Sequence, residues 1–291
     1  MYSQIDSNKR KTTILISIFI AVILLIGWIF SDILGYGYGA MIIAFVISII
    51  MTLTSYYKGD KIALSSSGAK KIQKEDNPYV YRLVENLCIT AGLPIPNVHI
   101  INSPAMNAFA TGRDPEHASI AMTTGIIEGL ENEELEGVIA HELSHIKNYD
   151  IRVMTIVIVL VGAIALLSDM FFRMRLFGGR RSGKDSANGY MMIIGIVLMI
   201  LSPIIAHLIK LAISRKREYL ADASGSLLTR YPEGLARALE KISQSNQPLK
   251  TANAATAHLF ISNPFKKKGV SSLFSTHPPI QDRINKLRSM A

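Results

Sequence analysis

The sequence is poor in cysteine and in acidic residues, and both shortages narrow the classes of protein to which it can belong. Cys88 is the single cysteine among 291 residues, which excludes an intramolecular disulfide and fits a reducing compartment. Lysine and arginine number 31 against 22 acidic residues, giving a net charge of +9. These basic residues flank apolar blocks, a placement that predicts contact with an anionic lipid bilayer and argues against nucleic acid.

Charge is missing altogether from long stretches of a chain that is 49% hydrophobic. Thr12 to Phe30 and Ile33 to Tyr57 are uncharged, and each is long enough for a helix to cross the hydrocarbon core of a membrane. Val153 to Ser168 and Gly189 to Ile209 are two further apolar stretches. The first block is too long for the apolar region of a signal peptide, and no A-x-A-like cleavage site follows it. We therefore expect a retained anchor.

These blocks divide the chain into four parts: a membrane hairpin at 1–57, a polar stretch at 58–150, a second apolar helix pair at 151–213, and a polar stretch at 214–291. The two polar stretches are expected to form one α+β domain. Apolar spacing predicts a helix over Pro78–Ala91, and acidic residues predict another beginning at Asn132. Strand-like segments are Asn97–Ile101, Asn107–Thr111 and Ser119–Thr124. The predicted fold class is a mainly α membrane protein with four apolar helices and this α+β domain.

The basic flanks also predict an orientation in the membrane. They place the N-terminus and residues 58–150 on the cytoplasmic side of a cell membrane, with the turn at Gly35–Gly39 outside. If the third and fourth apolar blocks both cross, the loop between them carries five basic residues to the outside, against this rule. A re-entrant or surface-lying hairpin is the alternative. In either case the two polar stretches share one compartment.

His141-Glu142-Leu143-Ser144-His145 forms an H-E-x-x-H pattern inside the helix predicted from Asn132. The i, i+4 spacing puts both imidazoles on one helical face, where they can bind one zinc ion. Glu142 projects beside them, placed to act on a water molecule at the metal. The alternative is an ordinary polar patch on an amphipathic helix. The position of the motif on a well-formed helix favours the metal site.

A catalytic zinc ion needs three protein ligands, so a third ligand should be visible. Glu218 begins an E-x-x-x-D pattern and is a candidate. Asp222 lies one helical turn further on, where its carboxylate could accept the second N–H of a ligand histidine. Spacing alone leaves an equal alternative, in which Glu218 is the acidic partner of Arg215 or Arg217 on a solvated face.

Taken together, the motifs resemble the HtpX family of membrane metalloproteases, which are relatives of the enzymes that cut prenylated proteins and of mitochondrial stress proteases. Nearly the whole chain shares the resemblance, and four segments match in order: Met106–Gly112, His141–His145, Arg217–Asp222 and Ser275–Pro279. The resemblance implies that His141, His145 and Glu218 bind zinc. It also implies that Glu142 is the catalytic base and that Asp222 supports a ligand.

Two more sites follow from the resemblance. The strand at Asn107–Thr111 resembles the edge strand that pairs with the substrate backbone in related zinc proteases, and Asn107 becomes a candidate substrate contact. An ordinary sheet strand is the alternative. His277 matches a histidine that assists the transition state in such families, whereas a histidine before two prolines is also typical of a turn.

The resulting functional prediction is a zinc-dependent endopeptidase, multi-pass in the cell membrane, whose active site faces the cytoplasm and whose substrates are proteins or peptides, membrane proteins above all. The resemblance implies quality control of misfolded membrane proteins. Two alternatives are a non-proteolytic membrane protein with a structural or sensory zinc site, and a transporter with four spans. A structural zinc site usually closes with a fourth cysteine or histidine, and the single cysteine disfavours it.

The distance along the chain predicts where the site lies relative to the membrane. Apolar sequence resumes at Ile151, six residues after His145. If the motif helix continued unbroken, a rise of about 1.5 Å per residue would place Ile151 roughly 9 Å from His145. The site would then lie at headgroup depth and would favour segments close to a substrate's own membrane span.

Overall fold

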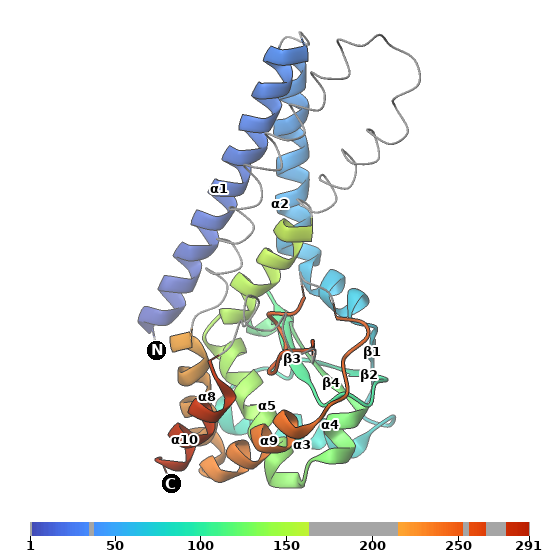
Figure 1. Ribbon diagram of the computed structural model, residues 1–291, viewed down its shortest axis with the longest axis vertical. Coiled ribbons are helices and arrows are strands. Elements are labelled where there is room, and N and C mark those ends of the chain that lie inside the picture. The colour runs from blue at the N-terminus through green and yellow to red at the C-terminus, as the bar shows by residue number, and fades with distance from the viewer. Residues whose placement is uncertain (1, 35–37, 163–214, 253–255, 266–277, 291) are drawn as a thin grey trace.

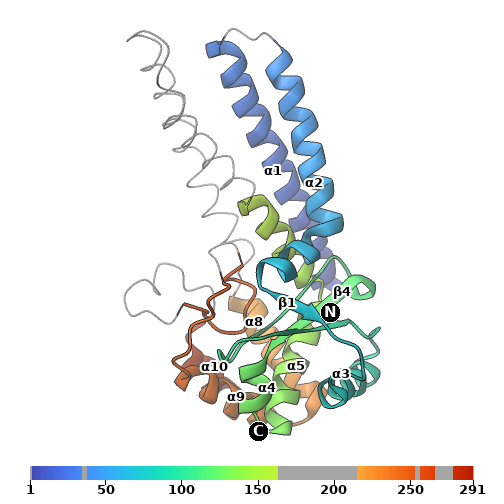
Figure 2. The same ribbon diagram turned by 90° about the vertical axis from the view of Figure 1, so that its right-hand side faces the viewer.

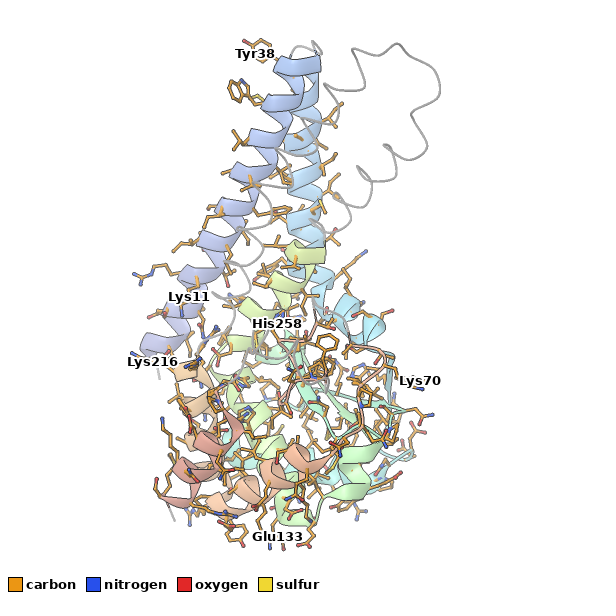
Figure 3. The ribbon with its side chains drawn as sticks, in the orientation of Figure 1. Lys11, Tyr38, Lys70, Glu133, Lys216 and His258 are labelled. Atoms are coloured by element: carbon orange, nitrogen blue, oxygen red, sulfur yellow. The ribbon has the colours of Figure 1, made fainter. Side chains whose placement is uncertain are left out.

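The computed structural model describes residues 2–34, 38–162, 215–252, 256–265 and 278–290. Two long helices, α1 (Tyr2–Leu34) and α2 (Gly39–Ser66), run side by side and stand above a globular part that holds a sheet and shorter helices (Figures 1 and 2). Tyr38 marks the far end of this helix pair, whereas Lys11 and Lys216 lie at the end next to the globular part (Figure 3).

The helix pair has the surface expected of a membrane hairpin. Large apolar side chains of α2 are exposed along its length, among them Ile43, Val46, Ile50 and Leu53. Exposed apolar surface of this extent is unfavourable in water and is favourable against lipid. Met41–Ser66 is the one helix among the described residues that is long and apolar enough to be counted as a candidate span.

Of the four predicted apolar helices, the first two blocks therefore lie in α1 and α2. The third block is described as far as residue 162, within a helix over 150–162. The rest of the third block, all of the fourth block and the basic loop between them lie outside the described residues.

The sheet has four strands in the order β1-β2-β4-β3, formed by β1 (Ala69–Lys71), β2 (Asn97–Ile101), β3 (Ala108–Gly112) and β4 (Ala118–Thr123). The β2–β4 pair is parallel, and the other two pairs are antiparallel. A short 3₁₀ turn, η1 (Pro115–His117), connects β3 to β4. The three predicted strands are confirmed to within one residue, whereas β1 was not predicted. Strand β3 lies at the edge of the sheet, as the resemblance implied.

The remaining helices are α3 (Pro78–Ala91), α4 (Thr124–Gly129), α5 (Asn132–Lys147), α8 (Arg215–Thr229), α9 (Pro232–Gln244) and α10 (Ile280–Arg288). Helix α3 begins where predicted because Asn77 accepts a hydrogen bond from the Val80 N–H and Pro78 occupies the first helical position. Helix α5 begins with the Glu134 carboxylate accepting from the Glu131 N–H at 2.9 Å.

Helix α5 lies at the centre of the globular part, with β3 on one side and α8 and α9 on others (Figure 1). The apolar core around it takes residues from both polar stretches, including Val138 and Ile139 of α5, Leu235 of α9 and Ile284 of α10. The rings of Phe109 on β3 and Phe260 meet edge to face at 5.1 Å. This packing fixes α5 against the sheet edge.

The condition of an unbroken motif helix, on which the position of Ile151 depended, is not met. Helix α5 ends at Lys147, and helical structure resumes only at residue 150. Between them Tyr149 has a φ of 60°, in the left-handed region that ends many helices. The chain therefore changes direction directly after the H-E-x-x-H segment, and the straight rise used to place Ile151 does not apply.

Candidate metal centre

Helix α5 presents the two motif histidines to helix α8, which presents Glu218. The Nε2 atoms of His141 and His145 lie 3.2 Å apart. A carboxylate oxygen of Glu218 lies 3.9 Å from Nε2 of His141, and its other oxygen lies 3.6 Å from Nε2 of His145. Candidate ligand atoms of the three residues all fall within 4.8 Å of one another, and all three residues are buried. The solvated face considered for Glu218 is thereby excluded.

The close approach of the two helices depends on a glycine. A Cβ atom placed on Gly225 of α8 would lie 2.9 Å from the backbone nitrogen of His141, nearer than real Cβ atoms come. Glycine therefore lets the α8 backbone pack directly on α5 at the first ligand. Since Glu218 lies two helical turns before Gly225, the same contact sets the distance of its carboxylate from both imidazoles.

His141 is oriented by a carboxylate that is itself held from the C-terminal part of the chain. Asp222 Oδ1 lies 2.9 Å from His141 Nδ1, out of line with the ring N–H bond. Arg283 of α10 donates to both oxygens of Asp222, at 2.9 and 2.7 Å, and to the carbonyl of Ile261 at 3.1 Å. Although burial opposes it, this guanidinium holds the pKa of Asp222 well below its usual range. Asp222 is therefore a fixed negative charge beside His141.

His145 is oriented by a second carboxylate, which the sequence reasoning missed. Its Nδ1 lies 3.0 Å from Asp150 Oδ2, just beyond the turn that ends α5. Arg217 of α8 donates to the other oxygen of Asp150 at 3.4 Å. The signal available in the sequence was an acidic residue five positions after the second histidine, but the turn at Asn148–Tyr149 is what places it beside that ring.

The residues present fit a divalent cation. Asp222 and Asp150 each face an Nδ1 atom, which places the ring protons there and leaves the Nε2 lone pairs of both histidines pointing into one buried space with the Glu218 carboxylate. Such a set of electron-pair donors repels itself unless a cation lies between them. Burial lowers the pKa of His145, but Asp150 and Glu218 outweigh it and raise that pKa to about 9, so the space favours positive charge.

The balance of buried charge points the same way. Four carboxylates surround the two imidazoles, and two guanidiniums, those of Arg217 and Arg283, oppose them; the carboxylates belong to Glu142, Asp150, Glu218 and Asp222, and all six residues are buried. This leaves two negative charges in excess, which one divalent metal ion would neutralise. Buried charges without a counter-charge cost several kcal/mol each, about 3–5 kcal/mol when a partner is removed.

Glu142 lies beside the two histidines and is not one of the three residues in the candidate metal-binding group. It is 2% exposed, and burial raises the pKa of its carboxyl group while the neighbouring histidines oppose the rise. The backbone of Ala110, in the middle of β3, lies close enough to this carboxyl group to lower its pKa slightly. Glu142 therefore lies between the two histidines and the edge strand.

The edge of β3 is engaged at both ends by other parts of the chain. The Ala108 carbonyl accepts from the Ile261 N–H at 3.0 Å, and the Gly112 N–H donates to Thr155 Oγ1 at 3.1 Å. The Asn107 side chain donates to the Ser262 carbonyl at 3.0 Å. Asn107 thus fixes the segment beside β3, and its predicted substrate contact stays a prediction. His277 lies outside the described residues.

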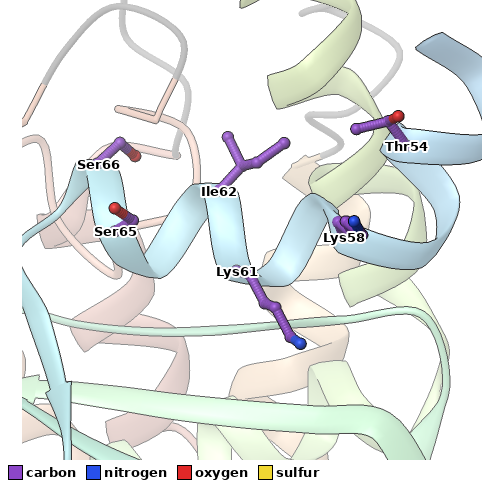
Figure 4. A pocket seen from close by; sticks show the side chains of 6 residues that line it. All are labelled: Thr54, Lys58, Lys61, Ile62, Ser65 and Ser66. Carbon is purple, nitrogen blue, oxygen red and sulfur yellow. The ribbon is translucent and has the colours of Figure 1, made fainter. Parts of the chain in front are cut away.

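Two other features stand apart from this centre. Cys88 is buried in α3, and burial raises the pKa of its thiol to about 11, so it is inert. A groove of about 530 Å³ lies along α2 (Figure 4), lined by Thr54, Lys58, Lys61, Ile62, Ser65 and Ser66. None of the groups around the two histidines lines it, so it is no part of the metal cluster.

Known proteins resemble the chain in sequence and in fold. The model of peptidase family M48 matches residues 74–291. A "Protease HtpX homolog" of Dictyoglomus turgidum is 45% identical over 289 residues, which is 99% of this chain and 94% of that protein. One from Tropheryma whipplei is 46% identical over 290 residues, covering 100% and 98%.

A solved structure shares the fold. The crystal structure of S. mikatae Ste24p matches with a TM-score of 0.50 and 19% identity, covering 99% of this chain and 67% of that chain. At this identity the match concerns the arrangement of the elements alone.

Proposed function

Because the chain belongs to peptidase family M48 and is a membrane metalloprotease of the HtpX type, we propose that it is a zinc-dependent endopeptidase acting at the cytoplasmic face of its membrane. His141, His145 and Glu218 are the proposed ligands, and Glu142 is the proposed base. The observation that carries this proposal is the convergence of three buried ligand groups within 4.8 Å, beside a buried glutamate and an edge strand.

Zinc is the metal that this donor set favours. Two imidazoles and one carboxylate, with a further position open, are the ligands of catalytic zinc in several metalloproteases. A zinc ion held there supplies Lewis acidity to a water molecule and to the peptide carbonyl. The rival structural zinc site would need a fourth cysteine or histidine, and the cluster found among the described residues has three members.

Glu142 supplies the proton transfers. Its carboxylate accepts a proton from the attacking water and returns it to the nitrogen of the departing amine. Burial raises the pKa of this carboxyl group, which brings it nearer to the pH at which it must both take and release a proton. Glu142 lies next to Ala110, so the proton is handled where a peptide along β3 would present its backbone.

We assign substrate binding to the middle of the β3 edge, between the contacts that other parts of the chain make at Ala108 and Gly112. An extended peptide adds to a sheet edge through main-chain hydrogen bonds, which carry little sequence preference. Unfolded segments of proteins are the substrates that such binding accepts. Together with the membrane helices, this supports misfolded membrane proteins as substrates and a role in their quality control.

The orientation and the division of the chain complete the proposal. Lys9 to Lys11 at the start of α1 and Lys58 and Lys61 near the end of α2 support a cytoplasmic position for both ends of the helix pair. In the proposed division, the polar stretches at 58–150 and 214–291 together make up the protease domain, and the third and fourth apolar blocks are assigned to a second helix pair.

The decisive test is Glu142→Gln in the full-length protein in detergent. Because Glu142 is assigned as base and not as ligand, caseinolytic activity should fall by at least about 10²-fold while the zinc content stays at one ion per chain. Glu133→Gln, an exposed glutamate near the start of the same helix, is the matched control and should retain activity. Loss of zinc in Glu142→Gln would overturn the assignment, and full activity would overturn the mechanism.

A further inference from the structure

A side chain of the membrane helix α1 reaches the carboxylate that orients His145. Asn8 is 1% exposed and lies near the start of α1. Its Nδ2 atom lies 2.8 Å from the Asn148 carbonyl oxygen and 2.8 Å from Asp150 Oδ1. The two partners are 140 and 142 residues away along the chain, so this contact ties the first helix to the turn that ends α5.

The chemistry of the partners determines which way the amide points. A backbone carbonyl and an ionised carboxylate accept hydrogen bonds and donate none. An amide oxygen facing them would be repelled by both, so the nitrogen must face them with its two N–H groups. Asn8 therefore uses its full donor capacity on this one turn.

Both acceptors have a role in the metal centre. Asn148 is the cap residue after Lys147, at the end of α5, where backbone carbonyls lose their partners within the helix. Asp150 accepts from His145 through its other oxygen, at 3.0 Å. Asn8 thus fixes the helix end that carries His145 and also the carboxylate that sets the direction of its ring.

We propose that Asn8 is a positioning residue of the metal centre, acting through Asp150 on His145, so that the first membrane helix completes the ligand geometry. The inference rests on the proposed metal site. Its chemical basis is that a carboxylate which orients a ligand histidine must itself be held, and that loss of such outer contacts typically weakens metal binding about 10–100-fold.

A purely structural role for Asn8, as an anchor of α1 on the globular part, makes a different prediction. It would affect the melting temperature but not the metal. Thr12 offers the matched control, because it lies one turn further along α1, is 5% exposed and has a hydroxyl without a hydrogen-bond partner among the described residues. Thr12→Val removes a buried polar group of the same helix without touching the turn at Asn148–Asp150.

The test uses the full chain in detergent or nanodiscs and three variants, Asn8→Ala, Asn8→Asp and Thr12→Val. Zinc affinity is measured by chelator competition, and ligand geometry by the visible absorption of the cobalt-substituted protein. Asn8→Ala should weaken zinc binding about 3–10-fold, less than loss of a direct orienting group. Asn8→Asp keeps the shape but opposes Asp150 with a second carboxylate, and should weaken binding about 10–100-fold. Both should alter the cobalt spectrum, and Thr12→Val should alter neither.

Circular dichroism shows whether each variant is folded, and so separates loss of zinc affinity from loss of folding. A larger loss of zinc affinity in Asn8→Asp than in Asn8→Ala, which differ in charge, supports the positioning role of Asn8. If both Asn8 variants kept the wild-type zinc affinity and cobalt spectrum, the inference about Asn8 would be overturned and the proposed metal site would stand. An equal loss of zinc affinity in Thr12→Val would have the same meaning. A wild-type chain that binds zinc no better than His145→Ala would overturn the proposed metal site itself, and the inference with it.

Discussion

His141 and His145 project from one helix, but the groups that orient them come from different parts of the chain. Asp222 and Arg283, from α8 and α10, hold His141 inside the globular part. Asp150 holds His145, and its own partners are Arg217 and Asn8 of the long helix α1. One histidine is therefore supported by the core of the globular part and the other by the end next to the long helices, so the two should respond differently to the same kind of change.

The largest difference is expected from removing the two orienting carboxylates. Asp222→Ala removes the two shortest contacts of the buried Arg283 guanidinium and should lower the free energy of unfolding by about 3–5 kcal/mol. Asp150→Ala should cost less, because Arg217 lies at the longer distance of 3.4 Å. Each should weaken zinc binding about 10–100-fold. Urea unfolding and chelator competition measure the two quantities, and equal destabilisation by both variants would remove the proposed asymmetry.

Removing the metal should sharpen the same contrast. Zinc at 100 times its dissociation constant should stabilise the folded protein by about 2.7 kcal/mol, and a chelator should take this away. Hydrogen exchange of the zinc-free protein should increase more at Asn148 and Tyr149, at the end of α5, than in α8 around Asp222, because the Arg283 pair persists without metal. Equal loosening at both places would contradict the comparison.

Gly225→Ala tests the support of His141 through packing. The added Cβ would lie 2.9 Å from the His141 nitrogen, and overpacking of this kind typically costs about 1–3 kcal/mol. Separation of α8 from α5 should also weaken zinc binding. Gly39→Ala is the control, since an added Cβ there meets nothing within 4 Å. Thermal unfolding that ranks the two alanine variants equally would show that α8 can move away without cost.

The smallest expected effect is a gradual dependence of the free energy of unfolding on pH in the zinc-free protein. The pKa of His145 is raised from 6.5 to about 9, so the stability that this group contributes is present below pH 6.5 and is lost as the pH rises towards 9. Asp150→Asn should flatten this part of the profile, while Asp222→Asn should leave it. The pKa of Asp222 is lowered, so its own contribution is lost on the acid side instead. Urea unfolding measured from pH 6 to 10 distinguishes the Asp150→Asn variant from the Asp222→Asn variant.

The parts of the fold that local chemistry determines could be predicted from the sequence. Helix α3 begins and ends where its capping residues and apolar spacing place it, and α5 begins at Asn132 as its acidic first turn indicates. The histidines of the motif meet because a helix puts positions four apart on one face. Glu218 could be named as a candidate ligand, but the sequence could not decide between a ligand and a residue on a solvated face. Its burial against α5 depends on the close approach of the helices that Gly225 allows.

The outer contacts of the site could not be predicted, because each depends on a distant part of the chain. Arg283 reaches Asp222 across 61 residues, and Asn8 reaches Asp150 across 142. The break after α5 was also missed, since Tyr149 adopts a left-handed conformation that glycine or asparagine usually signals. Strand β1 escaped prediction because three residues, two of them lysines, carry too little of an alternating pattern.

The hydrogen bond from Asn8 to Asp150 has a consequence for how the protein is made. A ribosome adds about 5–20 residues per second, so the 142 residues that separate the pair take about 7–28 s to synthesise. Glu218 follows later still. During that interval the nascent chain holds its first membrane helix but no finished metal site. With the ligands proposed above, a protease assembled in this order cannot cut itself, or its neighbours at the insertion machinery, before Glu218 has been synthesised.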